Sequence, residues 1–267
     1  MSSWRRLTEE LECWHSSGTI ATFWWRDDDA IDVTPQLDRL LRCAGSIPVS
    51  LAVIPSRASR ALADRIGGEQ SIAVLQHGWA HVSHLSGGQS EYPSSRTDEE
   101  VSRELVEGRA ILLGLFGTQA IPIFVPPYHA FDPRFVPLLA RNGFKGISRK
   151  GPRQEPPRVD GLVEVNAHVS PITWSKPPAF AGDDTYLDRI VEHLHGCRVG
   201  RYDAAEPTGL LTHHLDQNAE SFAFIARFAE VVSEHPGATW LSAKEIFDVH
   251  RAPTTSSPAS ASAKGFQ

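Results

Sequence analysis

Three consecutive carboxylates lie near the start of the chain, directly after an apolar run. Asp27, Asp28 and Asp29 follow the aromatic residues 23–25 and a single arginine, Arg26. Adjacent carboxylates repel one another and shift each other's pKa values, so a bound cation would offset part of this repulsion. An exposed acidic turn is the simpler interpretation of the three residues alone. The apolar residues before them favour a buried strand that carries the carboxylates to a functional site.

Two histidines with metal-ligand spacing follow a second apolar run. His77 and His81 are four residues apart, after the apolar stretch 71–76. Two imidazoles at this spacing can bind one metal ion if the segment forms a helix or a tight turn. With one carboxylate they leave coordination positions open for water and substrate, as a hydrolytic metal requires. Histidines that serve only as hydrogen-bonding groups are the alternative interpretation.

Two further polar segments also follow apolar runs. The turn 125–129 contains two adjacent prolines, which fix the backbone so that an N–H group could be held as an oxyanion donor. A purely structural turn is the alternative. Near the C-terminus, His213 and His214 follow the apolar run 209–212. Histidine can act as a general acid because its pKa lies near neutral pH, although both histidines could simply cap the strand.

The elements that must position these residues alternate along the chain. Apolar, β-rich runs predict strands over 19–25, 48–54, 71–76, 121–125, 162–169 and 209–213. Amphipathic patterns predict helices over 35–43, 57–66, 98–116, 133–142, 185–194 and 219–233. Repeated strand–helix units predict a parallel sheet in one α/β domain, and six or seven units predict closure into a barrel. Chemistry in such barrels lies at the C-terminal ends of the strands, where the polar segments fall.

Composition restricts the partners. The net charge is −6 and there is no stripe of Lys and Arg, which argues against nucleic acid or an anionic membrane as a partner. No apolar run reaches the ~18 residues of a membrane-spanning helix. The first 17 residues are charged and lack the apolar core of a signal peptide, which favours a cytoplasmic location. The three cysteines are far apart and indicate neither a disulfide framework nor a thiolate zinc site.

The domain boundaries follow from the same patterns. Residues 1–18 are expected to form a helical lead-in, and residues 19–250 the catalytic domain. Residues 251–267 consist mostly of Ala, Ser, Thr and Pro. Such a segment cannot bury enough apolar surface to offset the entropy of ordering, so a disordered tail is expected.

In their order along the chain, the four polar segments resemble the motifs of the polysaccharide deacetylase superfamily, the chitooligosaccharide-deacetylase homology domain. The resemblance extends over residues 19–250 and is closest to the divergent, cytoplasmic-looking polysaccharide deacetylase-like branch. It implies a distorted (β/α)7 barrel that binds one divalent metal ion, often zinc. It also implies a small-molecule or carbohydrate substrate.

The first two motifs imply the metal site and the base. The Asp-Asp pair of the first motif falls on Asp28 and Asp29, which makes Asp28 the catalytic base and Asp29 a metal ligand. The second motif, His-[Ser/Thr]-x-x-His, falls on His77 and His81 as the other two metal ligands. Gly78 stands in the slot that the family fills with a hydroxyl residue.

The third motif, Arg-x-Pro-Tyr-Gly, is only partly kept. The resemblance makes the backbone N–H of Tyr128 the oxyanion donor. Val125 replaces the arginine that orients the base in the family, and His129 replaces the glycine. Arg26 or Arg96 could take over the role of the missing arginine.

The fifth motif, Leu-x-Leu-His-Asp, can be aligned in two registers. One makes His213 the general acid, with His214 as the polar neighbour that hydrogen-bonds and orients it. Sliding the alignment by one residue makes His214 the acid and places a leucine after it, which could not orient an imidazole. We therefore expect the first register. Trp79, Pro127 and Trp174 are expected to contact the substrate.

The predicted reaction is metal-dependent hydrolysis of a C–N amide, most simply an N-acetyl group on a sugar. The metal would polarise the carbonyl and activate its bound water as the nucleophile. Asp28 would take the water's proton and His213 would protonate the leaving amine. Two alternatives remain: hydrolysis of a small cyclic or linear amide, as in the allantoinase-like branch, and a non-catalytic carbohydrate-binding descendant.

Overall fold

The computed structural model describes residues 2–153 and 159–247, and a parallel sheet is their central element. Neighbouring strands follow the order β6-β5-β4-β3-β2-β1-β7, and β8 pairs with the start of β1. The strands are β1 Ala21–Ala30, β2 Val49–Val53, β3 Ile72–His77, β4 Ala120–Val125, β5 Gly146–Ile147, β6 Val163–Glu164, β7 Thr208–Thr212 and β8 Ala238–Trp240.

The sheet closes on itself through a short irregular segment. Lys150 bridges to Ala167, and Val169 bridges to Leu210 on β7, both in parallel. This segment joins the β5–β6 side of the sheet to β7, which already pairs with β1. The closed ring confirms the predicted fold, a single α/β domain with a distorted (β/α)7 barrel.

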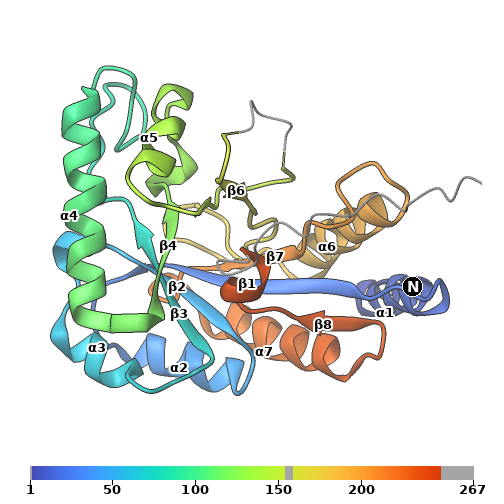
Figure 1. Ribbon diagram of the computed structural model, residues 1–267. Coiled ribbons are helices and arrows are strands. Elements are labelled where there is room, and N and C mark those ends of the chain that lie inside the picture. The colour runs from blue at the N-terminus through green and yellow to red at the C-terminus, as the bar shows by residue number, and fades with distance from the viewer. Residues whose placement is uncertain (1, 154–158, 248–267) are drawn as a thin grey trace, which may run out of the picture.

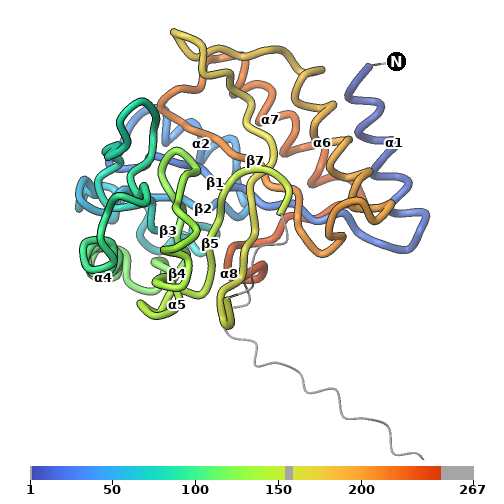
Figure 2. Tube along the Cα trace, turned by 90° about the horizontal axis from the view of Figure 1, so that it is seen from above, coloured from blue at the N-terminus to red at the C-terminus, as the bar shows by residue number. Residues whose placement is uncertain are grey.

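The described part of the chain has eight α-helices; in Figure 1, α2, α3 and α7 lie below the sheet and α4 lies to its left. In Figure 2, α1 lies beside α6, and an ion pair between Glu10 and Arg198 (2.7 Å) joins these two helices. Six of these eight helices begin at a side-chain cap. At the start of α2, for example, the Thr34 hydroxyl accepts from the Leu37 N–H. Their bounds are α1 Ser3–Ser16, α2 Pro35–Ala44, α3 Arg60–Ile66, α4 Asp98–Phe116, α5 Val136–Arg141, α6 Asp183–Arg198, α7 Ala219–Glu234 and α8 Ala243–Ile246.

The side chains of β1 alternate between two environments. Trp24 packs in a small core with Leu75, Val125 and Phe247, inside the ring of strands. Phe23 and Trp25 belong instead to the large core that the strands share with helices such as α2 and α7. Since side chains alternate across a strand, Arg26 and Asp28 continue on the side of Trp24.

Two predicted strands have different bounds in the structure. The strand predicted over 19–25 extends to Ala30 as β1, so the three aspartates lie on the strand itself. The strand predicted over 162–169 is interrupted after β6, where the Arg149 N–H donates to the Asn166 side-chain oxygen (2.8 Å) and the Asn166 N–H donates to the Glu206 carboxylate (3.1 Å). The helical lead-in expected over 1–18 contains α1, and the two elements that the sequence patterns missed are β5 and β8.

The predicted tail, 251–267, and the domain boundary near residue 250 lie outside the described residues. Among the helices that the structure describes, none has both the length and the apolar character that crossing a membrane would require.

Candidate active site

The three predicted metal ligands meet at the C-terminal ends of β1 and β3. Asp29 Oδ1 lies 3.1 Å from His77 Nε2 and 3.2 Å from His81 Nε2. Asp29 has a positive φ of 70°, and the register between β1 and β2 shifts at this point. That irregularity interrupts the strict alternation of the strand, so that Asp28 and Asp29 can both contribute to one site.

The hydrogen bond on the far side of the His77 ring fixes its tautomer. His77 Nδ1 lies 3.0 Å from the backbone carbonyl oxygen of Val125, which can only accept, so Nδ1 carries a proton. The neutral ring therefore directs the lone pair of Nε2 at the Asp29 carboxylate, and a cation is needed between these two acceptors. A ring N–H that donates to a backbone carbonyl is the usual arrangement of a metal-bound histidine. This group fits a divalent metal ion.

The electrostatics of the three ligands agree with that arrangement. Burial would raise the pKa of Asp29, but the hydrogen bond and charge of His77 and the charge of His81 hold it well below its usual range. Burial lowers the pKa of His77, yet Asp29 and Asp28 outweigh it and raise that pKa. Burial lowers the pKa of His81. The carboxylate is thus ionised, and without a metal the added positive charge is a proton on His77.

Asp28 is paired with an arginine on its own strand. Arg26 is fully buried, and its Nε and Nη2 donate to Asp28 Oδ1 and Oδ2 at 2.8 and 3.0 Å. Burial alone would raise the pKa of Asp28, but the Arg26 guanidinium and the nearby His77 lower it. Arg26 Nη1 also donates to Ser148 O (3.0 Å), across the barrel. The other proposed substitute, Arg96, pairs with Glu104 (2.6 Å) instead.

Asp27 faces the other side of β1 and organises the end of β7. Its carboxylate accepts from the Thr212 hydroxyl (2.6 Å) and from the backbone N–H of His214 (3.0 Å). The His214 Nδ1 lies 2.5 Å from Asp27 Oδ1. Burial lowers the pKa of His214, but the charge and hydrogen bond of Asp27 raise it.

His213 is therefore not oriented in the way that we expected from the sequence. The expected bond from His214 is absent among the described residues, because His214 binds Asp27, and His213 Nδ1 has no partner there. Instead, the Trp174 and His213 rings pack perpendicular to each other, with centroids 4.8 Å apart. Trp174 is 55% exposed, so its ring also borders solvent.

The proline turn brings Tyr128 next to the metal ligands. Pro127–His129 form a short 3-10 turn after β4, in which Tyr128 and His129 have positive φ values of 58° and 57°. The Tyr128 ring stands 4.4 Å from the His81 ring, and its hydroxyl donates to the His81 carbonyl (3.0 Å). Two adjacent left-handed residues without glycine are strained, and such strain is concentrated at functional sites.

Three more residues complete the description of this region. Pro127 is buried, and Trp79 is half-buried in the turn between the two histidine ligands. Sequence analysis noted His129 only as a replacement for glycine. Burial and the charge of Arg26 lower the pKa of His129 to about 3, so a neutral imidazole lies near Asp28.

A second group of histidines and a carboxylate lies between α6 and β7. His168, His193 and Glu206 have potential ligand atoms within 4.8 Å of one another. His168 Nδ1 accepts from the backbone N–H of Gly209 (2.8 Å), which can only donate, so the ring proton sits on Nε2. That nitrogen faces Glu206 at 3.6 Å and has no lone pair for a metal. The group is a buried polar network and does not fit a metal site.

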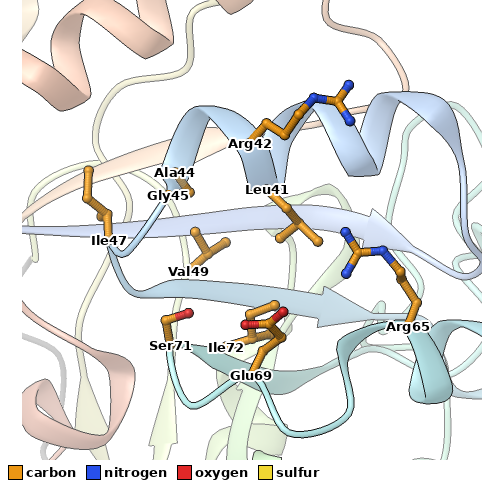
Figure 3. A pocket seen from close by; sticks show the side chains of 10 residues that line it. All are labelled: Leu41, Arg42, Ala44, Gly45, Ile47, Val49, Arg65, Glu69, Ser71 and Ile72. Atoms are coloured by element: carbon orange, nitrogen blue, oxygen red, sulfur yellow. The ribbon is translucent and has the colours of Figure 1, made fainter.

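A cavity of about 150 Å³ lies at the N-terminal ends of strands β2 and β3, opposite the ends that carry the candidate site (Figure 3). It is lined near the starts of β2 and β3 by residues such as Val49 and Ile72, together with Arg42, Arg65 and Glu69. The strands are parallel, so this cavity is a full strand length away from Asp29 and His77. It takes no part in the site.

Comparison with known proteins shows what the fold is similar to. No family model and no curated protein sequence matches the chain. Solved structures of polysaccharide deacetylases and carbohydrate esterases do match it, at low sequence identity. The fold is that of the solved polysaccharide deacetylases, which is the fold that the resemblance drawn from the motifs implied.

Three of these structures are informative. A protein from Mycobacterium smegmatis described as a polysaccharide deacetylase has 17% identity and a TM-score of 0.63, over 85% of this chain and 89% of its own. A family 4 acetyl xylan esterase from Clostridium thermocellum, solved with a cobalt ion, has 16% identity and a TM-score of 0.53, over 85% and 90%. A family 4 pseudoenzyme, solved as a mutant with restored activity, has 15% identity and a TM-score of 0.54, over 86% and 68%.

Proposed function

We propose that this chain is a metal-dependent hydrolase that cleaves a C–N amide, most simply the N-acetyl group of a sugar. The observation that carries the proposal is the His77 ring, whose Nδ1–H bonds the Val125 carbonyl while Nε2 faces Asp29. A metal site of this kind, next to a separately paired carboxylate at Asp28, has the parts that hydrolysis of an amide needs.

Asp29, His77 and His81 would hold the metal. Two imidazoles and one carboxylate are a ligand set typical of catalytic zinc, and they leave further positions open. When bound, the ion would polarise the acyl carbonyl and lower the pKa of water. We propose zinc as the resident ion.

Asp28 would act as the general base. The bidentate ion pair with Arg26 holds its two oxygens in place and keeps the carboxylate ionised near neutral pH. Arg26 thus supplies from β1 the contact that the resembled family supplies from its third motif. In a non-catalytic descendant, the loss of the motif arginine at Val125 would mark lost chemistry. The ion pair between Arg26 and Asp28 weakens that alternative.

The remaining groups would bind the acyl group and the leaving group. The Tyr128 backbone N–H, held in the strained turn, would donate to the developing oxyanion. His213 would protonate the leaving amine, while His214, fixed by Asp27, supports the end of β7. Trp79, Pro127 and the exposed Trp174 would contact the substrate, since flat apolar rings suit a sugar face or a small cyclic amide.

The test is a release assay with matched variants. The zinc-loaded protein is incubated with N-acetylated sugars and with small linear and cyclic amides. Acetate, ammonia and the ring-opened products of the cyclic amides are measured. Asp28→Asn should reduce turnover by ~10²-fold or more with zinc content unchanged. Asp27→Asn, an adjacent carboxylate with other partners, should reduce it much less.

The outcomes separate the alternatives. Acetate release supports the deacetylase proposal. Ammonia release from a primary amide, or opening of a cyclic amide, supports the small-amide alternative. An equal loss of turnover in Asp27→Asn and Asp28→Asn would reassign the base. A protein that binds zinc and neither releases acetate or ammonia nor opens any of the cyclic amides would contradict the hydrolase proposal.

A further inference from the structure

A buried carboxylate lies beneath the turn that connects the two histidine ligands. Glu91 is 1% exposed and belongs to the segment between β3 and α4. Its Oε2 accepts from the Trp79 N–H (3.1 Å) and its Oε1 accepts from the Ala80 N–H (2.7 Å). Both amides lie between His77 and His81, so one carboxylate binds the backbone of the whole turn.

The carboxylate occupies the space of a missing side chain. Gly78 has a φ of +58°, and a Cβ atom at this position would lie 2.0 Å from Glu91 Oε2 and 2.4 Å from Pro127 Cγ. The resembled second motif has Ser or Thr at this position. In this chain no side chain fits there, because the Glu91 carboxylate and the Pro127 ring fill the volume.

Glu91 itself is held firmly by its neighbours. The next residue, Tyr92, is fully buried, and its ring packs against Phe124 and Phe131 at 5.7 and 5.3 Å. Arg96, fixed by its ion pair with Glu104, donates to the Glu91 carbonyl (3.4 Å). These contacts hold the Glu91 backbone in place, so that its carboxylate is a fixed hydrogen-bond acceptor.

The turn depends on such an acceptor. The Gly78 N–H donates to the Val125 carbonyl on β4 (3.1 Å), whereas the Trp79 and Ala80 N–H groups donate to Glu91. A buried N–H without a partner costs about 1–3 kcal/mol. His81, at the end of the turn, has a φ of +57°, which an L-residue adopts only where its surroundings impose it. Hydrogen bonds to a charged acceptor are roughly twice as strong as neutral ones.

We propose that Glu91 is a positioning residue for the metal ligands. It fixes the backbone of the turn after Gly78 so that His81 Nε2 faces Asp29 beside His77. It takes the place that a hydroxyl side chain has in the resembled motif. The inference rests on the proposed metal site but not on the identity of the substrate.

The test measures zinc affinity without any substrate. Wild type, Glu91→Gln and Glu91→Ala are titrated with zinc in competition with a chromophoric chelator. Loss of a supporting group outside the ligands typically weakens metal binding by ~10–100-fold. We expect a loss of this size for Glu91→Ala and a smaller loss for Glu91→Gln, whose amide can accept from only one of the two N–H groups.

The matched control is Glu206→Gln. Glu206 is also a buried carboxylate (3% exposed), and it accepts from two backbone amides, those of Arg153 and Asn166, far from the metal ligands. Its substitution should leave zinc affinity within about threefold of wild type, even if stability falls by as much as in Glu91→Gln. Amide hydrogen exchange on the zinc-free proteins supplies the second readout: Trp79 and Ala80 should exchange faster in Glu91→Gln only.

The outcomes are distinct. Unchanged zinc affinity and unchanged exchange at Trp79 and Ala80 in Glu91→Gln would overturn the inference while leaving the metal site intact. An equal loss of affinity in Glu206→Gln would also overturn it, because general destabilisation would then explain the effect. A wild-type protein that binds no zinc would remove the proposed function and this inference together.

Discussion

Two groups of the same composition, two histidines and one carboxylate, lie at different places in this barrel. In one group, His77 Nδ1 donates to a backbone carbonyl. In the other group, His168 Nδ1 accepts from a backbone amide. That single difference decides whether Nε2, the ring nitrogen that faces the carboxylate, carries a proton. The His77 group is left with a lone pair that faces a carboxylate, whereas the His168 group directs an N–H at its carboxylate.

The comparison shows that residue type and proximity do not define a metal site. The His168 group is held by its own internal contacts: His193 Nδ1 lies 3.0 Å from the Thr208 hydroxyl, and the rings of His168 and His193 are 3.7 Å apart. Glu206 also accepts from the backbone of two segments. The group therefore joins α6 to β7, whereas the Asp29 group, at the open end of the barrel, can admit an ion.

The largest effect that would sharpen this comparison is on stability. Glu206→Ala removes the acceptor of two backbone amides, those of Arg153 and Asn166, and each buried donor left without a partner costs about 1–3 kcal/mol. We expect the free energy of unfolding to fall by about 2–6 kcal/mol, as measured by urea denaturation of the zinc-free protein. A change below about 1 kcal/mol would show that the network does not stabilise the packing of α6 against β7.

A smaller effect concerns the loss of stability at acid pH. Burial and the neighbouring His168 lower the pKa of His193 to about 3, below the ~6.5 of an unfolded chain. The unfolded state then binds more protons between these values, so stability falls as pH drops from about 6.5 toward 3. The unfolding free energy lost between pH 6.5 and pH 4 should be smaller in His193→Asn than in wild type by roughly 2–3 kcal/mol.

His129→Asn is the matched variant from the candidate active site. The pKa of His129 is also lowered to about 3, so this substitution should flatten the slope similarly. If neither variant changes the dependence of unfolding free energy on pH, these imidazoles are not held neutral as the structure implies.

The smallest effect concerns the pH dependence of zinc binding. The pKa of His77 is raised above its usual value by Asp29 and Asp28, against the effect of burial. In the zinc-free protein the protonated His77 stabilises the fold fully below about pH 6.5, and this contribution is lost as pH rises through the raised pKa. Zinc must displace that proton, so its stabilising effect should grow with pH across the same window.

Thermal unfolding with and without a chelator measures this difference. The zinc-dependent gain should increase by at most ~1.4 kcal/mol per pH unit for one released proton. A gain that is constant from pH 6 to pH 8 would show that His77 is not the group that zinc deprotonates.

Local patterns made much of the fold and part of the site predictable. Strand and helix periodicities are local, and they predicted the barrel and the segments that carry Asp28, His77 and Tyr128. The pairing of Arg26 with Asp28 also had a local signal, because residues two apart on a strand face the same side. The length of β1 was underestimated because Asp27 and Asp28 are poor strand formers that tertiary contacts hold in the sheet.

Contacts between distant segments were not predictable from one sequence. Asp27 binds His214 because β1 and β7 are paired with Asp27 opposite Thr212, a register that no local pattern contains. For the same reason Glu91 escaped notice, since its partners lie 11 and 12 residues away in a turn of irregular backbone. His168 and Glu206 are brought together only by closure of the barrel.

The measurement that tests the central claim most directly is the zinc content of purified protein after dialysis, by elemental analysis, in three chains. The account predicts one ion per chain in the wild type, one in His193→Asn and none in His81→Ala. Retention of the ion by His81→Ala together with its loss from His193→Asn would contradict the account, and so would two ions in the wild type. Either result would mean that the hydrogen bonds of His77 and His168 do not decide where the metal binds.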